Sequence, residues 1–313
     1  MKIVCLQLEP QLGQVEWNIK HATKMVSELK PEDVDVLVLP EMAFTGYVFT
    51  SKEHIKPYLE DAETGPSVQW AKTQAKRLNA HVVVGFPEKK KKTAVEGDNR
   101  EPDLVYYNSI AFVDPQGHLV TTYAKSFLYY TDENWAEEGP GFKSIEVDGL
   151  GKVGFGICMD VNPYQFKAPF AAFEFSSYHV ENKSTLLLCS MAWNRGEEAP
   201  KKEKPAPKPK KNASESTQGQ EDDGEEDWED DEETEEERAE RENHTLMFET
   251  IQYWAMRMNP FYTRGKEASE VYIAIANRIG TEGGNLFVGS SCVMKLSKKG
   301  PELLGALSAN EEG

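Results

Sequence analysis

Cysteine and histidine are scarce in this sequence, and neither is spaced as a set of ligands. The 313 residues include four cysteines (Cys5, Cys158, Cys189 and Cys292), far apart from one another, and six scattered histidines. Metal sites use these residues in close groups, so no metal is predicted and no cofactor is needed. Cys5, Cys189 and Cys292 each lie in an apolar run, where a buried reduced thiol is expected rather than a disulfide.

Long apolar runs, a basic patch and a phosphate-binding loop are also lacking. No apolar run reaches the roughly 18 residues that a membrane span needs, and the opening MKIVCLQLEP is typical of a strand, not of a leader peptide. The glycine-rich stretch 280–291 lacks the strand and helix that flank a P-loop, so we interpret it as a turn. The sequence predicts a protein of the cytoplasm or nucleus that binds neither membrane nor nucleic acid.

Negative charge is concentrated in one segment. The net charge is −18, but residues 197–242 hold 20 acidic and 8 basic side chains, which leaves only −6 for the rest. Segment 196–243 is Lys/Pro-rich and then acidic, and it cannot bury enough apolar surface to offset its ordering entropy. We predict a single domain over residues 1–313, interrupted by a disordered insert at about 196–243 that turns helical from Glu235. The insert is a tolerated surface loop or a partner-docking segment.

Apolar runs alternate with helical periodicity along the rest of the chain. Asp-Pro-Gln-Gly at 114–117 joins two of the runs as a hairpin. Alternating strands and helices with a hairpin predict an α/β fold with mixed sheets. The expected strands are 2–8, 34–40, 81–87, 104–113, 118–123, 151–158, 184–193, 271–279 and 291–296, and the expected helices are 17–29, 65–78, 165–176 and 244–257.

Three apolar runs end in residues that could do chemistry together. Glu41 follows VLVLP, Lys125 follows the second hairpin strand, and Cys158 ends GKVGFGIC. Each has an ordinary interpretation by itself: a loop glutamate, a solvated lysine and a core thiol. Brought to one point, a carboxylate, an ammonium and a thiol supply the base, the oxyanion stabiliser and the nucleophile of an amide hydrolase.

The order Glu, Lys, Cys and the flanking residues PEMAFTGY, YAKSFLYYTDE and GICMD resemble the nitrilase (carbon–nitrogen hydrolase) superfamily. The block CMDVNPYQFKAPFAAFEFSSY is similar to the protein N-terminal amidase branch. The resemblance spans about residues 2–306 apart from the insert. It implies a four-layer α-β-β-α sandwich, with two sheets face to face and helices outside. It also implies that Lys125 lies near the cysteine sulfur and that Glu133 is a second glutamate near the triad.

The sequence departs from the commoner superfamily pattern just after Cys158. Many relatives have an arginine two residues after the motif aspartate, where this chain has Asn162. We therefore expect Asp160 to be unpaired and to bind the α-ammonium of a substrate, unless it caps the following turn. In that case Glu133 is the next candidate. Trp193, at the end of an expected strand, is a further candidate for substrate binding.

The resemblance implies an amidohydrolase acting on the N-termini of proteins or peptides. It would convert N-terminal Asn, and Gln as well, to Asp or Glu through a thioester, releasing ammonia and feeding the N-degron pathway. A small-molecule amidase of the ω-amidase or carbamoyl hydrolase type is the alternative with the same chemistry. A non-catalytic scaffold acting through the acidic insert is the alternative from another class. The Asn/Gln preference and the oligomeric state stay open.

Overall fold

Two mixed β-sheets form the centre of the computed structural model, which describes residues 1–91, 103–195, 234–264 and 270–313. In one sheet the order is β1-β2-β3-β4-β5, with the first three strands parallel and the last two antiparallel. In the other the order is β13-β12-β9-β8-β7-β6, with β7, β8 and β9 parallel. The strands of these sheets are β1 (Ile3–Cys5), β2 (Val36–Val38), β3 (His81–Lys91), β4 (Leu104–Val113), β5 (Leu119–Ala124), β6 (Lys143–Val147), β7 (Gly151–Ile157), β8 (Leu186–Ser190), β9 (Val271–Ala276), β12 (Cys292–Ser297) and β13 (Gly300–Ala306).

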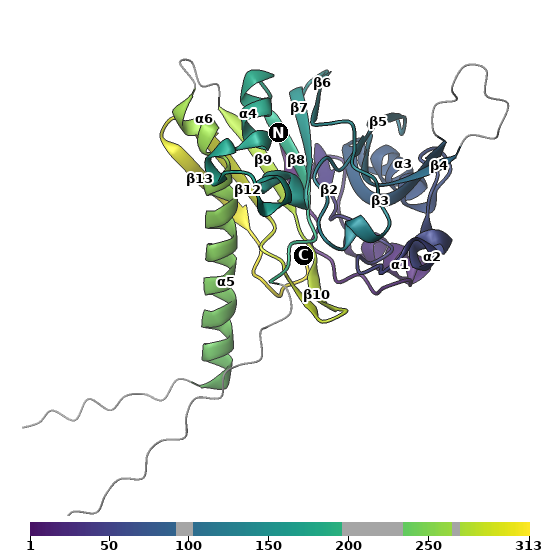
Figure 1. Cartoon of the computed structure of the whole chain (residues 1–313). Coiled ribbons are helices and arrows are strands. Elements are labelled where there is room, and N and C mark those ends of the chain that lie inside the picture. The colour runs from purple at the N-terminus through teal and green to yellow at the C-terminus, as the bar shows by residue number, and fades with distance from the viewer. Residues whose placement is uncertain (92–102, 196–233, 265–269) are drawn as a thin grey trace, which may run out of the picture.

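The sheets pack face to face, and helices cover their outer faces (Figure 1). Phe112 of β4 meets Phe155 of β7 between the sheets, with ring centroids 5.4 Å apart. Helices α1 and α3 lie on one outer face, and α4, α5 and α6 lie on the other. The expected four-layer sandwich is confirmed. The helices are α1 (Val15–Met25), α2 (Lys52–Ile55), α3 (Pro66–Leu78), α4 (Glu174–Glu181), α5 (Glu235–Arg257) and α6 (Asn259–Thr263).

Local sequence explains where the best-predicted helix begins and ends. Helix α3 begins at Pro66. Proline has no backbone N–H, and this costs nothing here because N–H groups in the first turn of a helix have no partner within the helix. It ends at Leu78, because the capping residue Asn79 adopts the left-handed conformation (φ 49°) that stops a helix. Its apolar side chains recur at helical spacing and are buried against the first sheet.

The segment before α4 differs from the sequence prediction, whereas the start of α5 agrees with it. The helix expected at 165–176 is α4 and begins only at Glu174, because Gln165, Phe166 and Phe173 have positive φ and interrupt it. Helix α5 begins at Glu235, where the sequence predicted that the insert turns helical, and Thr234 and Glu237 form a capping box there. The remainder of the insert, 196–233, lies outside the described residues.

The glycine-rich stretch expected as a turn is a hairpin of β10 (Ile279–Glu282) and β11 (Asn285–Val288). Gly283 and Gly284 make its tight turn with positive φ. Strands β6 and β13 were not predicted, because both lie at sheet edges and neither carries a continuous apolar run. In the parts of the chain that the structure describes, no helix is long and apolar enough to cross a membrane.

Candidate active site

The three residues expected to carry the chemistry follow strands of both sheets. Glu41 lies just beyond β2, Lys125 directly follows β5 and Cys158 directly follows β7. Because the sheets face each other, these strand ends meet at one edge. Lys125 Nζ lies 2.6 Å from Glu41 Oε1, and both charges act on the thiol of Cys158. The structure therefore brings the predicted triad together.

Glu41 is held by close backbone packing. Its N–H donates to the carbonyl of Met191, at 3.3 Å, which ties it to the second sheet. On the other side, strand β3 contributes Gly85. A Cβ at Gly85 would lie 2.5 Å from the carbonyl oxygen of Pro40 and 2.7 Å from Cα of Glu41. Only glycine fits there without displacing Glu41.

The ammonium of Lys125 lies between two carboxylates. Its Nζ donates to Glu41 Oε1 and to Asp132 Oδ2, at 2.6 Å in both cases. The amide of Asn108 donates to the same two side chains, at 2.6 Å to Glu41 and 2.9 Å to Asp132. All four side chains are fully buried. A buried charge is tolerated only when it is paired in this way, so the network holds each group in one position.

The second acidic residue of the site is Asp132 and not Glu133, so that expectation is wrong. Both belong to the short 3₁₀ turn Asp132–Asn134, but the Glu133 side chain is exposed. Asp132 also accepts the N–H of Tyr129, at 3.0 Å. This local bond to a residue three positions earlier suits the short aspartate side chain. That preference was the signal in the sequence that could have identified it.

Burial and neighbouring charges set the protonation of the triad. Burial raises the pKa of Glu41 to about 7, with Lys125 opposing the rise and Asp132 adding to it. Burial lowers the pKa of Lys125, but Asp132 and Glu41 outweigh it and hold that pKa above its ordinary value. Burial, followed by Glu41, raises the pKa of Cys158 well above its usual range. Cys158 is therefore a protonated thiol beside a carboxylate whose pKa would suit a general base.

Cys158 lies in a sharp turn at the end of strand β7 in the second sheet. It opens the 3₁₀ turn Cys158–Val161 directly after β7, with a positive φ of 38°. A non-glycine residue in this region is strained, and such strain is common at active sites. The side chain is 7% exposed. The backbone N–H of Ala192 bonds to the thiol and lowers its pKa, so a backbone donor already lies beside the sulfur.

Asp160 holds this turn and lies away from the cavity. Its carboxylate is fully buried. It accepts backbone N–H groups of Ile157, Ser126 and Phe127, at 2.8, 3.0 and 2.9 Å, and the hydroxyl of Tyr123 at 2.7 Å. The expectation of an unpaired carboxylate that binds substrate is wrong, because four neutral donors satisfy it. The alternative, a cap for the turn, is what the structure shows.

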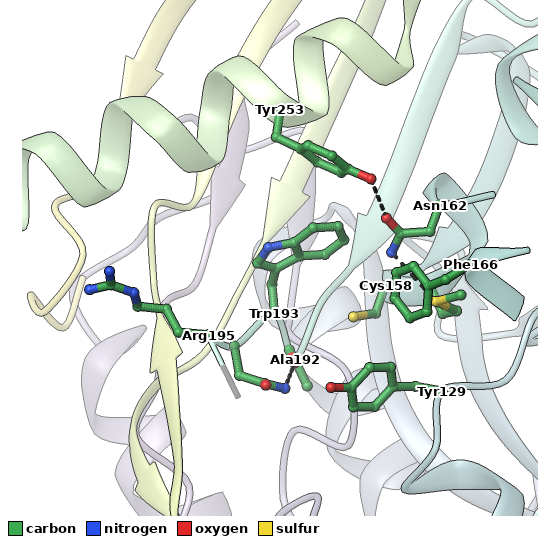
Figure 2. Close-up of a pocket in the computed structure, with 10 residues that line it drawn as sticks. Tyr129, Cys158, Asn162, Phe166, Ala192, Trp193, Arg195 and Tyr253 are labelled. Atoms are coloured by element: carbon green, nitrogen blue, oxygen red, sulfur yellow. Dashed lines mark hydrogen bonds between the residues drawn. The ribbon is translucent and has the colours of Figure 1, made fainter. Parts of the chain in front are cut away.

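A cavity of about 320 Å³ opens beside the sulfur of Cys158 (Figure 2). Trp193, a residue expected to bind substrate, lies in its wall and packs against Tyr253 with ring centroids 5.4 Å apart. The hydroxyl of Tyr253 donates to Asn162 Oδ1 at 2.6 Å. Four of the ten residues that line the cavity are aromatic. The ten are Tyr129, Cys158, Met159, Asn162, Phe166, Ala192, Trp193, Asn194, Arg195 and Tyr253.

Helix α5 also fixes the loop that completes the cavity wall. Arg257 Nε donates to the carbonyl of Val161 at 2.7 Å, and its NH1 group donates to the carbonyl of Phe170. The guanidinium lies over the rings of Phe170 and Phe173, at 4.7 and 5.0 Å from their centroids. Because Phe166 lies in this loop, Arg257 holds one side of the cavity in place without entering it.

The arrangement is suited to acyl transfer. The thiol of Cys158 lines the cavity, and a buried carboxylate, a buried ammonium and a backbone N–H act on it. These are the parts that a thioester mechanism requires. Among the residues that the structure describes, no group of three or more His, Cys, Asp or Glu side chains is arranged to hold a metal ion.

Comparison with known proteins agrees with this geometry. The model of the carbon–nitrogen hydrolase family matches residues 2–166. Over its whole length the chain is 31% identical to a protein N-terminal amidase of Schizosaccharomyces pombe and covers 97% of that protein. Crystal structures of an N-terminal amidase with an Asn-Glu-Ala or a Gln-Val peptide match with TM-scores of 0.72 and 0.71, at 26% and 25% identity, and cover 100% of this chain and 96% of theirs. A Saccharomyces cerevisiae member of branch 10 of the nitrilase superfamily, 17% identical with a TM-score of 0.64 over 100% of this chain and 87% of that one, shares the expected fold.

Proposed function

The chain belongs to the carbon–nitrogen hydrolase family, and we propose that it is a protein N-terminal amidase that acts through Glu41, Lys125 and Cys158. It hydrolyses the side-chain amide of an N-terminal Asn or Gln, giving Asp or Glu and ammonia. The observation that carries the proposal is the buried Glu41–Lys125 pair beside Cys158, at the floor of a cavity that opens to the surface. The solved N-terminal amidase structures with Asn- and Gln-initiated peptides support both substrates.

In the first half of the reaction, the thiol attacks the amide carbon. Glu41 accepts the proton of Cys158 as the sulfur–carbon bond forms, and negative charge moves to the amide oxygen. An ammonium has three N–H donors, of which Lys125 uses two for Glu41 and Asp132. The third is free for the oxyanion, and the N–H of Ala192, beside the sulfur, is a second donor. Protonated Glu41 then gives its proton to the departing nitrogen, which leaves as ammonia.

In the second half, water hydrolyses the thioester. Glu41, ionised again, accepts a proton from the water that attacks the acyl carbon. The same two donors hold the second oxyanion, and the sulfur leaves as its proton returns. Acid and base roles alternate on one carboxylate, which the raised pKa of Glu41, about 7, favours at neutral pH.

The proposed place of the reaction follows from its chemistry. All four cysteines are free thiols, which suits the reducing cytoplasm or nucleus. There the products, proteins with N-terminal Asp or Glu, would enter the N-degron pathway. The small-molecule amidase alternative keeps the same catalytic residues and differs only in the substrate that the cavity accepts.

The decisive experiment measures ammonia and product mass with purified protein. Peptides that begin with Asn and Gln are the test substrates, and the same peptides with Asn or Gln at the second position are controls. An ω-amide of a free keto acid and a carbamoyl amine represent the small-molecule alternative. We expect ammonia only from the Asn- and Gln-initiated peptides. Faster turnover of either small amide would refute the N-terminal amidase proposal and favour the alternative.

A further inference from the structure

Recognition of a free N-terminus has to occur inside the cavity. Three covalent bonds of about 1.5 Å each separate the side-chain amide carbon of an N-terminal Asn from its α-nitrogen. With that carbon at the sulfur of Cys158, the α-ammonium lies within about 4 Å of the reacting carbon. A Gln substrate adds one bond. The group that recognises the ammonium must therefore lie in the wall beside Cys158.

No carboxylate is available at that wall among the described residues that line the cavity. Asp160 is fully buried and satisfied by four donors, and Glu133 is exposed outside the wall. The one charged lining residue is Arg195, which has the wrong sign and extends away from Cys158 (Figure 2). An ionic partner, the usual means of binding an ammonium, is missing from the described wall.

The wall offers aromatic faces instead. The rings of Tyr129, Phe166, Trp193 and Tyr253 surround the sulfur of Cys158 (Figure 2). A cation is attracted to the face of an aromatic ring, most strongly to that of tryptophan, and aromatic pockets of this kind hold ammonium ligands elsewhere. Trp193 is fixed by its edge-to-face contact with Trp254, with ring centroids 5.7 Å apart.

Asn162 adds a neutral acceptor to this wall. The hydroxyl of Tyr253 donates to its Oδ1, so the amide oxygen is held facing the cavity with a second lone pair available. The side chain is almost fully buried. An arginine at this position would place a cation where an ammonium has to bind.

We infer that the α-ammonium of the substrate is recognised by cation–π contact with Trp193, supported by the neighbouring rings and by Oδ1 of Asn162, rather than by a carboxylate. This inference rests on the proposed function and names how its substrate is selected. Acetylation removes the charge and with it the cation–π attraction, so we expect a blocked N-terminus to bind more weakly.

The test uses two peptides that differ only in the ammonium. One begins with Asn, and the other begins with a 3-carbamoylpropanoyl group, which keeps the amide and the chain length but lacks the α-nitrogen. The ratio of their kcat/KM values measures recognition of the ammonium. Trp193→Leu should lower this ratio by about 3- to 30-fold, and Trp193→Phe by less, because a smaller ring binds a cation more weakly. Asn162→Asp should raise the ratio several-fold, because it adds an anion beside the same position.

Two control variants distinguish cation–π recognition by Trp193 from the loss of any tryptophan and from an effect of the Glu133 charge. Trp17→Leu removes an exposed tryptophan and should leave the ratio unchanged. The inference is overturned if both Trp193 variants slow the two peptides equally, if the unaltered enzyme shows no preference, or if Glu133→Gln abolishes the preference. If Trp193→Leu fails to melt cooperatively, the Trp193→Phe ratio decides. Absence of ammonia from every Asn- and Gln-initiated peptide would instead refute the proposed function, so the two failures are distinguishable.

Discussion

Replacement of Asp132 by asparagine tests the charge network at the centre of the site. The change keeps the size of the side chain and removes its charge. Oδ2 of Asp132 accepts from Lys125 at 2.6 Å, and Oδ1 accepts from Asn108 at 2.9 Å. Lys125 Nζ and Asn108 Nδ2 can only donate hydrogen bonds; neither can accept one. Whichever way the new amide is turned, its NH₂ group faces another donor, so one buried hydrogen bond is lost and one repulsive contact appears.

The expected size of the effect follows from these contacts. A buried hydrogen bond to a charged group contributes about 1.5–3 kcal/mol, and breaking one side of a buried ion pair costs about 3–5 kcal/mol. Because Lys125 keeps Glu41 as an anionic partner, we expect a loss of about 3 kcal/mol in the free energy of unfolding. Small displacements of catalytic groups lower rates by about 100-fold, which is the expected fall in kcat/KM.

The pH profile of kcat/KM distinguishes loss of the Asp132 charge from a structural defect, because only loss of the charge predicts the direction in which the profile moves. Glu41 must be ionised to accept the thiol proton, so kcat/KM rises with pH through the pKa of Glu41, about 7. The charge of Asp132 raises that pKa. Removing the charge should therefore lower it, and the rising limb of the profile should move to lower pH in Asp132→Asn.

The assay is the pH profile of kcat/KM with the peptide that lacks an α-nitrogen. An α-ammonium titrates at about 8 and would add a falling limb that obscures the first. The matched control is Glu133→Gln, which removes the same charge from an exposed neighbour and should leave both the melting temperature and the rising limb in place. A limb in Asp132→Asn that stays fixed or moves to higher pH would refute Glu41 as the titrating base.

Three further substitutions test single parts of the site. Cys158→Ala should abolish ammonia release with little change in melting temperature, because few buried atoms are lost; a core thiol would give the reverse result. Gly85→Ala should lower both turnover and melting temperature, because its Cβ would lie 2.7 Å from Cα of Glu41. The control Gly305→Ala adds a Cβ into open space within another strand and should change neither. Arg257→Ala should leave the carbonyls of Val161 and Phe170 without their donor and destabilise the protein by about 2–3 kcal/mol. It should raise KM more than it lowers kcat, and Arg257→Lys should restore only part of this loss.

The sequence predicts the fold correctly where a segment has one clear hydrophobic pattern. It fails where contacts with distant residues determine the local conformation. Strands such as β3 and β7 carry continuous apolar runs, as buried strands must. The edge strand β13 is almost wholly exposed, so no hydrophobic pattern marks it. The loop before α4 carries helical periodicity, yet residues in the left-handed region replace the first turns of the expected helix. Arg257, far along the chain, holds those turns, and local sequence does not encode that contact.

The same distinction applies to the site. Glu41, Lys125 and Cys158 were selected because the motifs around them resemble those of the superfamily, since each residue alone has an ordinary interpretation. The structure places them just after β2, β5 and β7. Asp160 was predicted to be unpaired because three of its four donors, the N–H groups of Ser126 and Phe127 and the hydroxyl of Tyr123, lie more than 30 residues away in the sequence.

Helix α5 shows why the insert and the cavity have to be considered together. The first turns of α5, Glu235 to Glu242, are exposed and highly charged, whereas Trp254 and Arg257 near its end are almost fully buried. The buried half contributes Tyr253 to the cavity and Arg257 to the loop beside it. The hydrogen bond between Tyr253 and Asn162 spans 91 residues of sequence, including the insert. Met247, Ile251 and Trp254 also pack in the same core as strands β7 and β8. Under the proposed function, the helix that follows the insert therefore supports the strand that positions Cys158 and also contributes to the wall where the substrate would bind.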